Sequence, residues 1–218
     1  VKAEARNNEE AVQSMMQEES SPIGYYRALR CIAEQMPRDM VFVAEGASTM
    51  DISRSVVNNY LPRTRLDAGS FGSMGLGHGF AIGAAVETGK HIMCLQGDGA
   101  FGFAGTECEV AVRYNLPITW VVFNNGGIGG HRPELFEGPH KPVGGMSLGA
   151  RYDIMMQGLG GLGSNTNPIL RLALTTTRTW TDKNGNFVPD CDLTNVLANG
   201  SAAFSDPDIA STPSAFTA

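Results

Sequence analysis

Two short motifs carry residue types that could hold a metal ion. Gly97-Asp98-Gly99 follows one apolar run, and Asn124-Asn125 follows the next. Mg²⁺ prefers hard oxygen ligands in octahedral geometry and usually shares them with phosphates. The Asp98 carboxylate, the Asn125 amide oxygen and the Gly127 backbone carbonyl would supply three ligands, and two diphosphate oxygens and a water would complete the shell. The motifs therefore predict a site for Mg²⁺ and a diphosphate.

The glycines of the first motif suit the same chemistry. Because they lack side chains, Gly97 and Gly99 let the backbone approach a diphosphate and donate amide hydrogens to it. A lone Gly-Asp-Gly sequence would equally suit a tight turn. Its combination with a double asparagine, one helix and one strand later, favours the ligand site.

Short β-branched runs alternate with helical stretches across the middle of the chain. This pattern is typical of an α/β fold in which a parallel sheet has helices on both faces. Both motifs then lie at the carboxyl ends of strands, where open α/β sheets bind ligands. The expected helices are 22–36, 50–60, 75–88 and 106–114, the last with a Thr106–Glu109 capping box, and the expected strands are 40–44, 65–67, 91–96 and 118–123.

Composition excludes several classes of partner. The 218 residues include 16 Lys and Arg against 22 Asp and Glu, and the net charge of −6 argues against nucleic acid or an anionic membrane. Apolar runs such as 118–123 are too short to span a bilayer, and the acidic first twenty residues are unlike a secretory signal. The four cysteines have no metal-like spacing, which predicts reduced thiols and a cytoplasmic location.

Three further blocks give these motifs a family resemblance. They are the segments 45–51 (EGASTMD), 69–75 (GSFGSMG) and 113–117 (RYNLP). Together with the two motifs, they resemble the diphosphate-binding half of thiamin-diphosphate enzymes, and within these the oxalyl-CoA decarboxylases and 2-hydroxyacyl-CoA lyases. The resemblance covers residues 20 to about 155 and implies that thiamin diphosphate and Mg²⁺ are cofactors.

The resemblance also implies roles for individual residues. Ala47 and Ser48 would touch the diphosphate, Met74 would contact the aminopyrimidine, and Arg54 would lie near coenzyme A phosphates, although it also suits an exposed helix. Glu107 is expected to face solvent, and His78 to be packed in the interior. The implied cofactor-binding set is Ala47, Ser48, Gly72, Met74, Gly97, Asp98, Gly99, Ala100, Asn125, Gly127 and Ile128.

The implied reaction is cleavage of a carbon–carbon bond next to an acyl-CoA carbonyl. The family also carries an amino-terminal pyrimidine-binding domain whose glutamate activates the cofactor, and we find no such domain here. We therefore expect another chain or a missing amino-terminal half to supply it, and expect no activity without it. We also expect a homo-oligomer, since the family's sites form between subunits. The glycines of 126–131 predict an altered substrate pocket. The alternative is a non-catalytic pairing module that keeps the fold without activity.

The ends of the chain differ from its middle. Residues 1–19 are polar and acidic and are interpreted as the remnant of a linker, and 20–160 as the cofactor-binding domain. Residues 161–218 are rich in turn formers and predict an irregular tail, disordered or foreign to the family. Within it, 178–192 weakly resembles a loop of bacterial outer-membrane receptors, and its acidic run suits polar turns better than a calcium loop. The tail is expected to be dispensable unless its apolar run 169–174 forms an edge strand.

Overall fold

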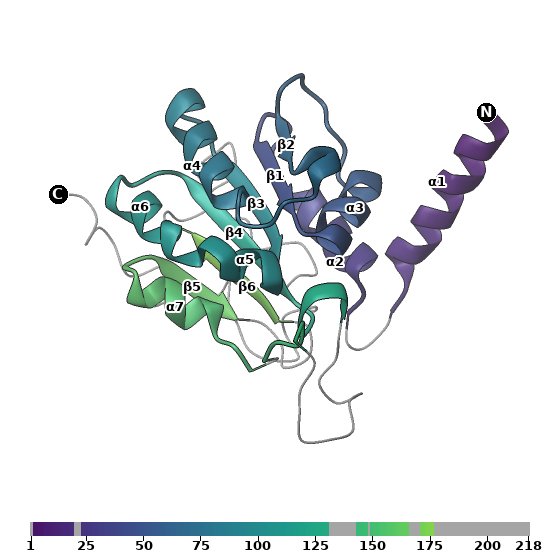
Figure 1. Cartoon of the computed structure of the whole chain (residues 1–218). Helices are drawn as coiled ribbons and strands as arrows, with labels where there is room; N and C mark the ends of the chain where they lie inside the picture. Colours follow the sequence, from purple (N-terminus) through teal and green to yellow (C-terminus); the bar gives the residue numbers. More distant parts are fainter. Residues whose placement is uncertain (1, 20–22, 131–142, 148, 166–170, 177–218) are drawn as a thin grey trace, which may run out of the picture.

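The computed structural model describes residues 2–19, 23–130, 143–147, 149–165 and 171–176. Helices and strands alternate along most of this length (Figure 1). The elements are α1 (Lys2–Gln17), α2 (Tyr25–Gln35), β1 (Val41–Glu45), α3 (Ala47–Val56), β2 (Arg65–Asp67), η1 (Gly69–Phe71), α4 (Gly77–Thr88), β3 (Ile92–Gly97), α5 (Asp98–Ala104), η2 (Gly105–Glu107), α6 (Cys108–Arg113), β4 (Ile118–Asn124), η3 (Ile128–Gly130), α7 (Tyr152–Gly158), β5 (Leu162–Asn165) and β6 (Arg171–Thr176).

The strands form one six-stranded sheet in the order β2-β1-β3-β4-β6-β5. The four strands predicted from the sequence, β1 to β4, pair in parallel. β6 then pairs antiparallel with β4, and β5 antiparallel with β6. The sheet is thus a parallel unit extended on one side by an antiparallel pair.

Helices cover both faces of the sheet, as the sequence predicts. Side chains alternate between the faces of a strand, so each buried strand feeds two cores. Phe42, Met93, Val121 and their neighbours pack with α1, α2 and α3 on one side. On the other side, α4 to α7 pack against a second cluster that includes Val43 and the fully buried Trp120.

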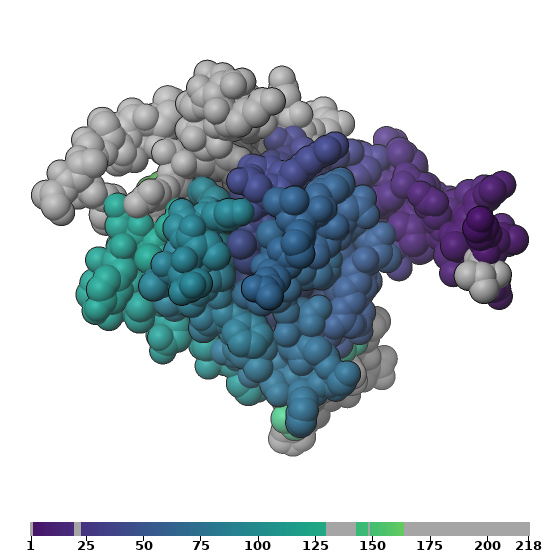
Figure 2. Space-filling view, turned by 90° about the horizontal axis from the view of Figure 1, so that it is seen from above, coloured from purple at the N-terminus to yellow at the C-terminus, as the bar shows by residue number. Residues whose placement is uncertain are grey.

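The amino-terminal segment interpreted as a linker is an α-helix. α1 packs on α2 through Met16, its one buried residue, and otherwise projects from the body of the molecule (Figures 1 and 2). Residues 1–19 contain neither Gly nor Pro and are rich in Ala, Glu, Gln and Met, which have high helix propensities. The interpretation as a linker remnant stays a prediction.

Three helix predictions need correction. α3 begins and ends earlier than predicted. α4 begins at Gly77, because the amides of Gly75 and Leu76 before it bind the Glu45 side chain. The capping box is wrong, because Glu109 bonds Arg113 at 3.0 Å and a 3₁₀ turn precedes α6. The sequence also places a loop where Asp98 begins α5.

Two parts of the predicted tail belong to the sheet. β6 overlaps the apolar run 169–174, yet it lies between β4 and β5 rather than at the edge. Its six residues pair with Thr119–Asn124, the strand that leads to the second motif. Residues 177–218, with the receptor-like segment and Cys191, lie outside the described residues.

Candidate functional site

A cleft of about 200 Å³ opens at the carboxyl ends of β1, β3 and β4. It is bounded by the starts of α3 and α5, the loop after η1 and the loop after β4. All eleven residues predicted to bind the cofactor line it: Ala47, Ser48, Gly72, Met74, Gly97, Asp98, Gly99, Ala100, Asn125, Gly127 and Ile128. The fold thus brings four separate segments to one place, while their contacts with a cofactor stay a prediction.

Four further residues line the cleft that sequence reasoning missed: Tyr25, Gly46, Thr49 and Gly129. Gly46 follows a strand end just as Gly97 does, and that position was the signal that could have identified it. Tyr25 gave no comparable signal, because its place on α2 predicts a core position. Its hydroxyl meets Asn125, 100 positions away in the sequence.

Asp98 is the one acidic side chain among the described residues that line the cleft. It is only 2% exposed. Its carboxylate accepts hydrogen bonds from the backbone N–H groups of Gly99 at 2.7 Å and Gly126 at 2.9 Å. Burial raises the pKa of Asp98, although these backbone hydrogen bonds oppose the shift. A cation in the cleft would stabilise the ionised form.

The Asn125 side-chain amide has two possible orientations here. One end lies 3.0 Å from the Gly127 carbonyl oxygen and 3.2 Å from Asp98 Oδ1, while the other lies 2.9 Å from the Tyr25 hydroxyl. With the nitrogen inward, the amide donates to both oxygens. With the oxygen inward, three oxygens converge. Adjacent ligands of an octahedral Mg²⁺ at about 2.1 Å are about 3.0 Å apart, so this spacing fits the ion.

Tyr25 suits either orientation of that amide, because a hydroxyl can donate or accept. Its ring stacks on Phe123, with centroids 4.9 Å apart and an angle of 7° between the planes. Burial raises the pKa of Tyr25 to about 12, with opposing hydrogen bonds from Thr49 and Asn125 and a supporting effect of the Asp98 charge. The hydroxyl therefore keeps its proton at neutral pH.

The segment 143–147 holds the loop after β4, which carries the Gly127 carbonyl, in place. Gly127 has a φ of +135°, and a Cβ there would strike the Gly144 carbonyl oxygen. Ile128 N–H donates to that same oxygen at 2.9 Å, and Met146 N–H donates to the Gly126 oxygen at 2.9 Å. The segment 143–147 thus pairs with this loop and requires glycine at position 127.

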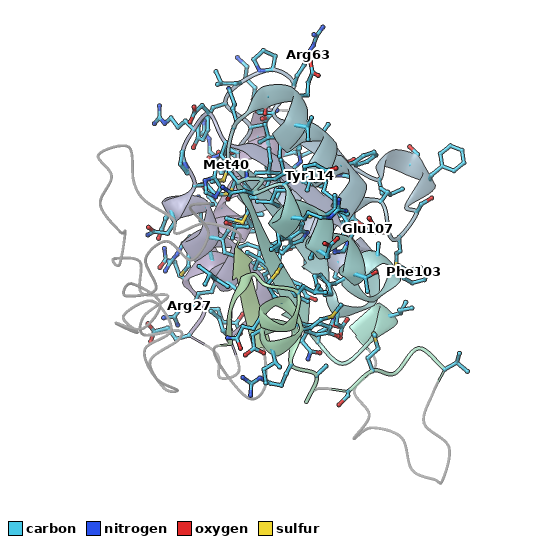
Figure 3. The ribbon with its side chains drawn as sticks, turned by 90° about the vertical axis from the view of Figure 1, so that its left-hand side faces the viewer. Arg27, Met40, Arg63, Phe103, Glu107 and Tyr114 are labelled. Carbon is cyan, nitrogen blue, oxygen red and sulfur yellow. The ribbon has the colours of Figure 1, made fainter. Side chains whose placement is uncertain are left out.

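Arg54 lies outside the cleft-lining set. Its guanidinium forms ion pairs with Asp51 at 2.9 Å and Asp67 at 3.1 Å on the surface. The predicted contact with coenzyme A therefore competes with two carboxylates and stays a prediction. Glu107 lies on the outer surface together with Phe103 (Figure 3), and His78 is fully buried, as predicted.

The structure yields two negative findings for the residues it describes. None of the described helices is both long and apolar enough to cross a membrane. No group of three His, Cys, Asp or Glu side chains among the same residues could hold a metal. An ion in the cleft would therefore depend on one carboxylate, an amide, a carbonyl and the oxygens of its ligand.

Comparison with known proteins places the cleft in a family. Residues 44–157 match the model "Thiamine pyrophosphate enzyme, C-terminal TPP binding domain", thiamine pyrophosphate being thiamin diphosphate. Because this match spans more than half of the chain, the chain belongs to that family of thiamin-diphosphate-binding domains. The fold is also found in benzoylformate decarboxylase from Polynucleobacter necessarius, with a TM-score of 0.54 and 24% identity over 66% of this chain and 29% of that one.

Closer relatives come from two groups of enzymes. Human 2-hydroxyacyl-CoA lyase 1 is 52% identical over 128 residues, which are 56% of this chain and 22% of the lyase. Oxalyl-CoA decarboxylase from Escherichia coli K12 is 40% identical over 176 residues, which are 78% of this chain and 31% of the decarboxylase. The chain thus spans less than a third of the length of either relative.

Proposed function

We propose that this chain forms the diphosphate-binding half of a lyase that cleaves a carbon–carbon bond next to an acyl-CoA carbonyl. The substrate would be oxalyl-CoA or a 2-hydroxyacyl-CoA, the classes named for its relatives. The observation that carries the proposal is the convergence of Asp98, Asn125 and the Gly127 carbonyl in a glycine-lined cleft. Bound thiamin diphosphate would supply a nucleophilic carbon and an electron sink for the cleavage.

The residues of the chain would bind and orient that cofactor. Asp98 and Asn125 would supply side-chain oxygens to Mg²⁺, and Gly127 would supply its carbonyl. The backbone at Gly97 and Gly99 can approach the diphosphate closely because no Cβ stands in the way. Met74 and Ile128 offer apolar side chains on the cleft wall for the ring system. These residues would position the cofactor, and none of them is assigned as the base that activates it.

The surroundings of the cleft suggest that a second domain covers it. Ala47, Ser48 and Gly72 on its walls are exposed. Ile128 on the cleft wall is 46% exposed, and Phe71, directly before the cleft residue Gly72, is 96% exposed. Exposed apolar side chains beside a cleft are typical of interaction surfaces. The pyrimidine-binding domain, supplied by another chain in an oligomer or by a longer form of this one, is the occupant we propose.

A cytoplasmic location is part of the same proposal. Cys31, Cys94 and Cys108 are buried free thiols, and burial raises the pKa of Cys108 to about 12. Neutral, buried thiols are the state expected of structural cysteines in a reducing compartment.

A non-catalytic pairing module is the second candidate. It is favoured by one observation, that Asp98 is the sole acidic residue lining the described cleft and is already assigned to the ion. Such a module would bind the diphosphate but would have no role in turnover.

Deuterium exchange at the thiazolium C2 of thiamin diphosphate separates these candidates. The chain with cofactor and Mg²⁺ should exchange at about the rate of the free cofactor, because Asp98, the one acidic side chain among the described cleft residues, is assigned to the ion. Addition of the pyrimidine-binding domain of a related lyase should accelerate exchange and allow acyl-CoA cleavage. Binding without acceleration in that mixture would favour the pairing module, and strong acceleration by the chain alone would contradict the half-site proposal.

A further inference from the structure

We infer that Glu45 is a positioning residue that fixes the glycine-rich loop 69–76 against the wall of the cleft. Glu45 ends β1 and is fully buried, at 0% exposure. It is not one of the residues that line the cleft, so it acts through the backbone that it holds. Its consequence for thiamin diphosphate rests on the proposed function, whereas its hold on the loop does not.

Four donors surround the Glu45 carboxylate. Oε1 accepts from the backbone N–H groups of Gly75 and Leu76, the latter at 3.2 Å. Oε2 accepts from the Gly77 N–H at 2.8 Å and from Gln96 Nε2 at 2.5 Å. Three consecutive backbone amides are thereby satisfied by one side chain, and all three can only donate.

These amides belong to the entrance of α4. The first N–H groups of a helix have no partner within it and carry a partial positive charge, so a carboxylate there is stabilising. Gly77 leaves the space this requires, because a Cβ at that position would strike Glu45 Oε2 and lie 2.9 Å from Gln96 Nε2. The position of the Glu45 carboxylate therefore requires glycine at position 77.

The same carboxylate joins two walls of the cleft. Directly after Glu45, the chain continues into Gly46, Ala47 and Ser48, which line one wall. The loop that Glu45 holds carries Gly72 and Met74, which line another. Since both walls are tied to one buried group, Glu45 sets the separation between them. A glutamine side chain cannot replace the carboxylate. Both oxygens of Glu45 face N–H donors, so the NH₂ group of the amide would meet N–H groups on one side.

Gln96 steadies this arrangement from β3. Its Nε2 lies 2.5 Å from Glu45 Oε2 and 3.2 Å from His78 Nδ1. His78 is in turn packed between Phe101 and Trp120, with ring centroids at 5.0 and 5.9 Å. The carboxylate is thus fixed from the protein interior and not from the cleft.

The test compares Glu45→Gln with Glu107→Gln, the same change on the exposed surface. Hydrogen–deuterium exchange without ligand should show faster exchange at amides 75–77 in Glu45→Gln, with β3 and β4 protected as in the parent chain. Affinity for thiamin diphosphate with Mg²⁺ should fall about tenfold or more, as expected for a lost hydrogen bond to a charged group. Glu107→Gln should change neither quantity.

Gly77→Ala provides a second route if Glu45→Gln does not fold. It crowds the carboxylate while keeping its charge, and Gly79→Ala in the same helix, where a Cβ meets nothing within 4 Å, is its control. Unchanged exchange at 75–77, or faster exchange with unchanged cofactor affinity, would overturn the positioning role. A parent chain that binds no thiamin diphosphate would overturn the proposed function instead, and exchange alone would then decide the role of Glu45 in the loop.

Discussion

Tyr25 lies behind the Asn125 amide and can accept its hydrogen bond in the orientation that a bound ion requires. When the amide oxygen faces an ion, its nitrogen needs an acceptor, and the Tyr25 hydroxyl at 2.9 Å is placed to be one. We predict that Tyr25→Phe lowers the affinity of the cofactor-bound chain for the divalent ion about tenfold, as is typical when a hydrogen-bond partner of a metal ligand is removed. Titration of Mn²⁺ by electron paramagnetic resonance at saturating thiamin diphosphate measures this.

Tyr26→Phe is the matched control for that experiment. Tyr26 is the next residue and packs, partly buried, against the same core. Equal Mn²⁺ affinities of the two variants would show that the Tyr25 hydroxyl does not orient Asn125.

His78 links stability to pH. Burial lowers the pKa of His78 from 6.5 to about 4, so the unfolded chain takes up this proton first as the pH falls. The folded-state pKa is the lower one, so the stability contribution is complete above about pH 6.5 and is lost towards pH 4. We predict a loss of about 3 kcal/mol across this window.

Urea unfolding of the parent chain and of His78→Asn between pH 4.5 and 7.5 tests this. The stability of the variant should depend less steeply on pH than that of the parent chain. Parallel curves for the parent chain and His78→Asn would refute the assignment.

Most of the cleft residues could be predicted from the sequence, because they lie next to one another in short motifs. Gly97, Asp98 and Gly99 are neighbours at a strand end, and parallel strands bring such ends together. Tyr25 and Glu45 could not be identified in the same way. Tyr25 contacts Asn125, 100 positions away, and Glu45 binds backbone amides 30 or more positions away. Both contacts form only after the helices have packed on the sheet.

At the scale of elements, α4 exposes an unusual surface. Gly79 and Gly83 are exposed on this helix, and Phe80 is 39% and Val86 67% exposed. A Cβ at Gly83 meets nothing within 4 Å. Because alanine favours a helix over glycine, we predict that Gly83→Ala stabilises the chain by about 0.5–1 kcal/mol and raises the melting temperature by about 1–4 °C.

The same substitution probes the proposed partner. If α4 packs closely against a pyrimidine-binding domain, the added methyl group should weaken that pairing while it stabilises the chain alone. Calorimetric melting and a binding titration report the two effects separately. A lower melting temperature for Gly83→Ala would show that position 83 is already packed within this chain.

Sequence patterns predicted long elements better than short ones. β1, β3 and β4 are buried on both faces and therefore read as continuous apolar runs. α5 and α6 are 7 and 6 residues long and too short for an apolar period to develop. The Glu109–Arg113 ion pair also competes with the capping box for the same carboxylate.

At the scale of the whole molecule, the sheet extends beyond the parallel unit. The sequence predicts that truncation near residue 163 is harmless, but β6 pairs with β4 over six positions. We now predict that a chain ending at Gly161 melts more than roughly 5 °C lower, since β4 becomes an unpaired edge. Cofactor affinity should fall too, because β4 positions Asn125. A chain ending at Thr176 is the control. Equal melting temperatures of the two truncated chains would show that β5 and β6 are dispensable.

The strands β5 and β6 were hard to foresee for a physical reason. Antiparallel pairing with β4 depends on backbone hydrogen bonds that any extended segment can form, so turn-rich composition does not prevent it. The apolar run 169–174 was a weak signal because it is short and flanked by Asn and Pro.

Calorimetric titration of the chain with thiamin diphosphate, with and without Mg²⁺, tests the central claim most directly. Asp98 would be the only charged protein ligand of the ion. We therefore predict binding that requires Mg²⁺ in the parent chain and its loss in Asp98→Ala, with the fold retained by circular dichroism. Affinity in Asp98→Ala equal to that of the parent chain, or binding indifferent to Mg²⁺, would contradict the account.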